Sequence, residues 1–101
     1  MNLRMKPDAI IEVRFKTTAE GWKTWDILGA EYFGCPLFVD GEGFDCRLLL
    51  GGRSILLGQK YELPVVFLCP DLALPKLAPG KAITLWEGKD VATGRVVRLG
   101  D

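Results

Sequence analysis

The residues best suited to contact another molecule are aromatic, and they cluster in one stretch of the sequence that glycines interrupt. Four of them follow Gly21 closely: Trp22, Trp25, Tyr32 and Phe33. Tryptophan and tyrosine provide large, rigid apolar surface with one polar atom, and they are enriched where binding energy concentrates at protein interfaces. The stretch therefore predicts a surface that binds another protein. The alternative interpretation is that these side chains plug one open end of a barrel.

Trp86 is a second candidate contact residue. In an expected strand over residues 82–87 it alternates with Ile83 and Leu85, so its side chain lies on the face opposite theirs. If those two aliphatic residues point into the core, Trp86 faces solvent. An exposed tryptophan extends an apolar patch of the kind that marks a binding site for a partner.

Residues for catalysis or metal binding are not evident. The chain contains no histidine, which excludes imidazole-dependent triads, histidine zinc sites and histidine phosphotransfer. Three acidic residues, Asp71, Glu87 and Asp90, lie near the expected loop ends. No pair of a nucleophile and a base accompanies them. Asp40, Glu42 and Asp45 form a second acidic group. A solvent-exposed hairpin turn explains this group better than a calcium-binding loop does. We expect no enzyme, no metal and no cofactor.

The three cysteines, Cys35, Cys46 and Cys69, are too far apart for a CxxC pair, and an odd number fits no closed set of disulfides. Each has apolar neighbours, which predicts buried free thiols in a reducing compartment. No apolar run has the length of a signal-peptide core or a membrane helix. We therefore expect a cytoplasmic protein that does not bind membranes.

The charges are balanced, with 13 Lys and Arg against 13 Asp and Glu, and they are interspersed along the chain. Nucleic-acid binding by counterion release needs several cations on one face. RNA binding is therefore the alternative function and protein binding the preferred one. In that alternative, Trp22 or Trp25 would stack on bases. The phosphates would be contacted by Arg14, Lys16, Lys23, Arg95 and Arg98.

A length of 101 residues, 49% of them hydrophobic, predicts a single domain with one core over residues 1–101. Alternation over residues 10–16 is typical of a strand with one buried face. Further strands are expected over residues 36–40, 44–50, 61–68, 82–87 and 94–99. Residues 21–35 are expected to form a long loop, and residues 69–80 an extended connection. The pattern predicts an antiparallel barrel or sandwich in which Pro64 marks an edge or a bulge.

The last third of the sequence carries a more specific pattern. It contains the runs Pro64-Val65-Val66-Phe67-Leu68, Leu77-Ala78-Pro79-Gly80-Lys81-Ala82-Ile83-Thr84-Leu85-Trp86-Glu87-Gly88 and Gly94-Arg95-Val96-Val97. Together with Ile11-Glu12-Val13 and Glu20-Gly21, these runs resemble the carboxy-terminal β-barrel domain of elongation factor Tu. The resemblance implies an all-β fold, a six-stranded antiparallel closed barrel of Greek-key type.

The departures from that family bear on function. In the elongation factors this domain contacts aminoacyl-tRNA, partly through a basic, glycine-rich stretch after the first strand. The equivalent residues 20–26 hold one cation, Lys23, and Trp86 replaces a basic residue. Residues 29–34 have the glycine spacing of a phosphate loop, but Cys35 follows where lysine is required. We expect no GTPase. We expect a stand-alone barrel that binds another protein, with translation-linked binding of RNA or tRNA as the alternative.

Overall fold

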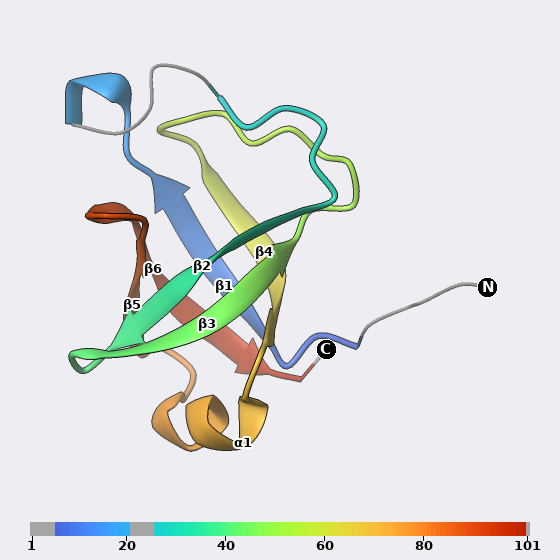
Figure 1. Cartoon of the computed structure of the whole chain (residues 1–101), viewed down its shortest axis with the longest axis vertical. Helices are drawn as coiled ribbons and strands as arrows, with labels where there is room; N and C mark the ends of the chain where they lie inside the picture. The colour runs from blue at the N-terminus through green and yellow to red at the C-terminus, as the bar shows by residue number, and fades with distance from the viewer. Residues whose placement is uncertain (1–5, 21–25, 101) are drawn as a thin grey trace.

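The computed structural model describes residues 6–20 and 26–100. Six strands form a closed, all-antiparallel barrel with the order β1-β4-β3-β2-β5-β6 (Figure 1). The barrel has Greek-key topology, because β2, β3 and β4 are successive neighbours and β5 returns to lie beside β2. This confirms the predicted fold class. The strands are β1 (Ala9–Phe15), β2 (Tyr32–Val39), β3 (Glu42–Leu49), β4 (Lys60–Phe67), β5 (Ala82–Trp86) and β6 (Asp90–Leu99).

Strand β1 supplies the centre of the hydrophobic core. Its alternate residues Ile11, Val13 and Phe15 are fully buried, as the sequence pattern predicts. The strand pairs with β4 from Ala9 to Arg14 and with β6 along its whole length. Because both edges of β1 are paired, it closes the barrel and leaves no free strand edge on either side.

Strands β1 and β6 approach each other closely at Gly94, which pairs with Val13. A Cβ atom at position 94 would overlap the carbonyl oxygen of Glu12 and lie 2.9 Å from the Cα of Val13. Both neighbours are backbone atoms of a central strand and have no room to move. A glycine is therefore required here so that β6 can pair with β1.

The β2–β3 hairpin turns through two residues, Asp40 and Gly41, whose φ angles of 50° and 80° are both positive. Val39 and Glu42 are the last paired residues before the turn. Positive φ at both positions is the geometry of the type I′ turn, whose twist matches that of the strands it joins. Strand β3 thus begins at Glu42, two residues before the strand expected over residues 44–50.

Strand β2 begins earlier than predicted. Tyr32 and Phe33 pair with Leu49 and Leu48 of β3, so they belong to the sheet, and the expectation that residues 21–35 form one long loop is wrong for them. Gly34 and Pro36 suggest a break when the sequence is considered locally. Pairing with the hydrophobic end of β3 overrides that local preference.

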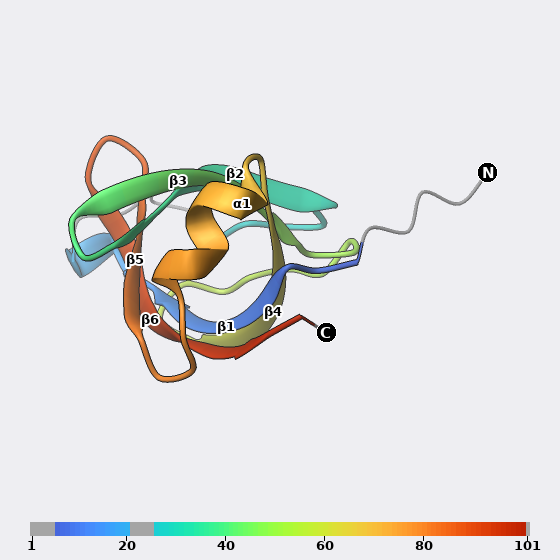
Figure 2. The ribbon, with the colours of Figure 1, turned by 90° about the horizontal axis from the view of Figure 1, so that it is seen from below.

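Residues 69–80 are not fully extended, in contrast to the prediction. They contain a short helix, α1 (Pro70–Ala73), and a 3-10 turn, η2 (Leu74–Lys76), which lie across one end of the barrel (Figure 2). Pro70 and the proline of η2 occupy first-turn positions, where a missing N–H is harmless and the fixed φ suits a helix. Ala73 and Leu77 are buried and close that end of the core.

Pro64 lies at a local edge inside the closed barrel. It pairs with Ile10 of β1 on one side. On the other side the β3–β4 ladder ends with the pair Leu48 and Val65, so Pro64 is the first residue beyond it. Its missing N–H therefore interrupts no ladder, which meets the expectation of an edge position without leaving an open sheet.

The close approach at Gly94 leads to a prediction about stability. We expect Gly94→Ala to lower the free energy of unfolding by about 3 kcal/mol, because the added methyl group forces β6 away from β1. Urea unfolding followed by circular dichroism measures this loss. Gly34→Ala is the matched control, since its Cβ would make only an ordinary 3.9 Å contact with the carbonyl oxygen of Cys46. Equal stability of the two variants would contradict the prediction.

Candidate functional site

A stacked pair of side chains projects from the outside of β2 and β3. The guanidinium carbon of Arg47 lies 4.7 Å from the centre of the Tyr32 ring, within the range of a cation–π contact. Tyr32 is 51% exposed. Within residues 6–20 and 26–100, no carboxylate forms an ion pair with Arg47. The pair therefore presents a preformed aromatic and cationic surface whose charge is not neutralised by these neighbours.

A groove of about 460 Å³ lies beside this pair. It is hollow because Gly34, on the outer face of β2 between Tyr32 and Pro36, has no side chain to fill it. The lining mixes aliphatic and charged groups from three strands, including Gly34, Pro36, Asp45, Arg47, Val66 and Leu68. Such a concave, largely apolar site with a few polar groups is suited to accept a side chain of a partner.

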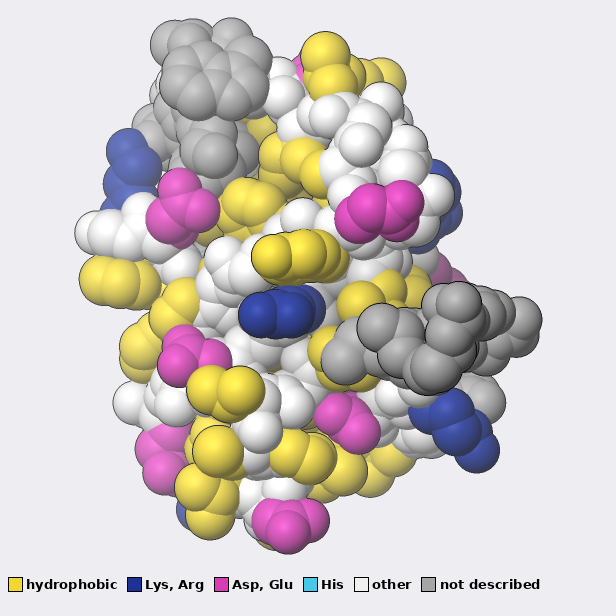
Figure 3. Space-filling view, turned by 45° about the vertical axis from the view of Figure 1, so that its right-hand side comes forward, with side chains coloured by type: hydrophobic (Ala, Val, Ile, Leu, Met, Phe, Trp, Pro, Cys, Tyr) yellow, Lys and Arg dark blue, Asp and Glu magenta, His cyan; other side chains and the backbone are white. Residues whose placement is uncertain are grey.

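Two exposed leucines extend this surface towards α1. Leu68 is 76% exposed and Leu72 is 64% exposed, and both line a smaller hollow that shares Asp45 and Leu68 with the groove. Figure 3 shows hydrophobic side chains distributed over this side of the molecule around a central basic one. We refer to this surface as the β2–β4 face. It consists of Tyr32, Gly34, Pro36, Asp45, Arg47, Leu68 and Leu72.

Trp86 lies on the outside of the barrel, as predicted from its alternation with Ile83 and Leu85. It is 41% exposed, whereas those two residues are buried. Its ring centre lies 6.3 Å from that of Phe38 on the neighbouring strand β2. The Phe38 ring in turn covers Gly43, where an added Cβ would lie only 2.7 Å from the ring. Trp86 and Phe38 thus form a second aromatic surface on the same side of β2.

The structure separates the aromatic residues that the sequence groups together. Tyr32 faces solvent, whereas Phe33 packs against the core, with its ring edge-on to that of Phe15 at 5.6 Å between centres. This location agrees with the plug interpretation for Phe33. Trp22 and Trp25 lie outside the described residues, as does Lys23.

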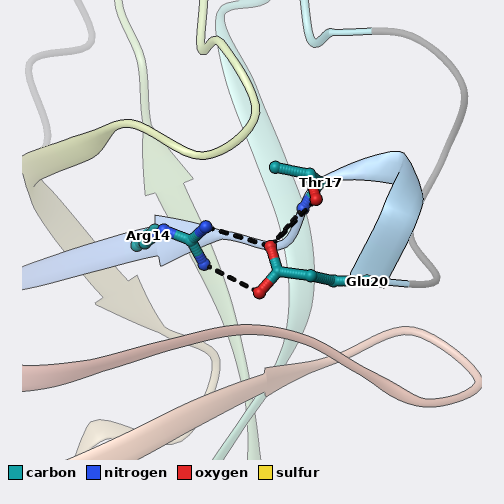
Figure 4. Close-up of polar contacts among 3 residues, drawn as sticks. All are labelled: Arg14, Thr17 and Glu20. Atoms are coloured by element: carbon teal, nitrogen blue, oxygen red, sulfur yellow. Dashed lines mark hydrogen bonds and ion pairs between the residues drawn. The ribbon is translucent and has the colours of Figure 1, made fainter.

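The cations proposed for RNA binding are partly neutralised by neighbouring acids. Arg14 donates two hydrogen bonds to the Glu20 carboxylate, at 3.0 and 3.3 Å (Figure 4). Arg95 forms an ion pair with Glu12 at 3.3 Å. Lys16 directly follows β1, and Arg98 lies opposite Ile10. Arg14, Arg95 and Arg98 therefore belong to the β1–β6 part of the barrel, where Glu20 and Glu12 neutralise the charges of Arg14 and Arg95.

Two of the cysteines are buried neighbours on facing strands. Cys35 pairs with Cys46, and the Cys46 thiol donates a hydrogen bond to the Cys35 carbonyl oxygen at 3.2 Å. The contact with Cys35, followed by burial, raises the pKa of the Cys46 thiol. Cys69 is exposed, so the expectation of three buried thiols is wrong for this residue, which begins the connection leading into α1.

No family model matches this chain, and no curated protein matches it. The fold defines a closed, six-stranded antiparallel β-barrel. Among the residues that the structure describes, no three Cys, Asp or Glu side chains are grouped so that they could hold a metal ion. None of the helices in the described ranges is long and apolar enough to cross a membrane.

The environment of Glu20 leads to a prediction about titration. Hydrogen bonds from Arg14 and then from Thr17 lower the pKa of the Glu20 carboxyl from 4.5 to about 2. Because the folded chain has the lower pKa, this contribution to stability is present above pH 4.5 and is lost as the pH falls through about 2. NMR titration of the carboxyl carbon should show this midpoint. Arg14→Gln should raise it, and a wild-type midpoint near 4.5 would contradict the assignment.

The cysteine environments lead to a prediction about thiol reactivity. In the native protein we expect one thiol per chain, Cys69, to react rapidly with Ellman's reagent, because Cys69 is exposed whereas Cys35 and Cys46 are buried. Cys35 and Cys46 should react only as the protein unfolds in urea. Cys69→Ser should abolish the fast phase. A fast phase that survives this substitution would show that a buried thiol is accessible.

Proposed function

We propose that this chain is a non-catalytic barrel domain that binds another protein through the β2–β4 face. The observation that supports this most directly is the stacked pair of Tyr32 and Arg47 beside the groove at Gly34. Tyrosine and arginine are enriched among residues that dominate binding energy, and such residues act best next to a pocket that excludes water.

The geometry of the face favours a partner segment of particular chemistry. Stacking on Tyr32 restricts the Arg47 side chain before binding, which reduces the entropy lost when a complex forms. The guanidinium is then positioned to donate two parallel hydrogen bonds to a carboxylate of the partner. The groove and the exposed Leu68 and Leu72 provide apolar contact area alongside. A segment with an apolar side chain next to an acidic one fits this arrangement.

The resemblance to the barrel of elongation factor Tu supports a binding role but does not separate protein partners from RNA. The charge distribution favours protein. Two of the cations suggested for RNA are paired with Glu20 and Glu12, and phosphate binding would have to displace those carboxylates. Translation-linked RNA binding is therefore the alternative that an experiment must separate from the proposal.

Gly34→Val provides a sharp test because it fills the groove without adding charge. The position is exposed, and its Cβ meets no close neighbour. Valine also suits a strand, so the free energy of unfolding should stay equal or rise by up to about 1 kcal/mol. Captures from cell lysate with the tagged wild type and this variant, with and without ribonuclease, should show protein partners that the variant loses.

Thr93→Val is the matched control, since it places the same side chain on an exposed strand position of β6, away from the β2–β4 face. The proposal is supported by a partner that the control and the ribonuclease-treated wild type both retain and that Gly34→Val loses. Direct binding of that purified partner to the wild type must then be shown. Capture that depends on RNA, or that Gly34→Val leaves unchanged, overturns it.

A further inference from the structure

A second groove, of about 500 Å³, lies on the outside of the barrel over the end of β2, strand β5 and the start of β6. Its lining contains two aromatic rings, Phe38 and Trp86, and two carboxylates, Asp40 and Asp90, with no lysine or arginine. We refer to it as the Trp86 groove. Its net charge is negative, and its aromatic surface is a face that attracts cations.

The two carboxylates of the groove differ in their partners. Asp40 holds the ammonium group of Lys81 at 2.7 Å, so a cation is already accommodated at this end. Asp90 lies opposite Trp86 in the β5–β6 hairpin. In the described part of the chain, no lysine or arginine forms an ion pair with Asp90. An unneutralised carboxylate thus lies across from a 41% exposed indole.

We infer that the Trp86 groove binds the guanidinium group of an arginine side chain from a partner protein. A guanidinium is planar and weakly hydrated, so it can stack on the indole while its N–H groups donate to the Asp90 carboxylate. A lysine ammonium has the charge but not the flat face. The complementary charge of the groove therefore selects a basic segment, and the aromatic surface selects arginine within it. This inference rests on the proposed function, because the arginine belongs to a bound protein.

The probe for this site is the blocked tripeptide acetyl-Gly-Arg-Gly-amide, with the citrulline tripeptide as a neutral control of the same shape. In proton–nitrogen NMR spectra of the whole chain, the arginine peptide should shift the indole signal of Trp86 and the amide signal of Asp90 in a saturable way. The citrulline peptide should not. Equal shifts from both peptides, or no saturable shift with the arginine peptide, overturn the inference.

Substitutions assign the binding to this groove. Trp86→Leu should weaken the arginine peptide about two- to fivefold, the range expected for an exposed cation–π contact. Asp90→Asn preserves shape and should weaken it about twofold or more, and less so at high salt. Unchanged affinity in Asp90→Asn overturns the inference even if Trp86→Leu fails to fold.

The same titration separates this inference from the proposed function. Gly34→Val leaves the Trp86 groove intact, so it should bind the arginine peptide with wild-type affinity while it loses the captured partner. If wild-type protein captures a partner through the β2–β4 face but its Trp86 signal does not respond to the peptide, the arginine site alone is refuted. The arginine site would also be refuted if methyl glucoside bound saturably and the arginine peptide did not. That result would assign the groove to a sugar.

Discussion

The structure depends on the close pairing of β1 with β6, which closes the barrel. The backbone of Gly94 packs directly against that of Glu12 and Val13, and only a residue without a Cβ permits this. Once β1 is held between β4 and β6, its alternate side chains Ile11, Val13 and Phe15 meet the residues that the other strands direct inward. Burial of these apolar side chains then provides most of the driving force for folding.

Closure also determines where this domain can bind. Each strand of the closed barrel pairs with a neighbour on both sides over part of its length, so it offers a partner strand less free edge than an open sheet does. The proposed recognition therefore uses side chains on the outer face. The outer row of strand β2 consists of an exposed ring at Tyr32, a gap at Gly34, and further apolar groups at Pro36 and Phe38. Both grooves described above border this row.

Much of the fold could be predicted from local sequence. The alternation of β1, the Asp40-Gly41 turn and the outward position of Trp86 each follow from patterns only a few residues long. The helical turn α1 and the early start of β2 could not be predicted in this way. Pro70 is compatible with either an extended chain or the first turn of a helix, and Tyr32 joins the sheet because Leu49, distant in sequence, lies beside it.

The candidate site was less accessible from sequence, because it is assembled across strands. Tyr32 stands out in the sequence as an aromatic residue, but its partner Arg47 is simply a charged residue in an apolar strand. The groove needs Gly34, Arg47 and Val66 to come together, which is a consequence of register rather than of spacing. Sequence alternation indicates which residues of each strand face outward. It does not indicate which strands lie side by side.

The outer row of β2 has a direction. Towards one end, Gly34 pairs with Arg47 of β3, which supplies a cation, and towards the other end, Phe38 is bordered by the carboxylates of Asp40 and Asp90. These two ends are four residues apart on β2, or about 13 Å in an extended chain. An extended ligand lying along the row would therefore bind in a single orientation, with an acidic and an arginine side chain four positions apart on one face. This spacing gives a recognition signature that can be sought in the sequences of candidate partners.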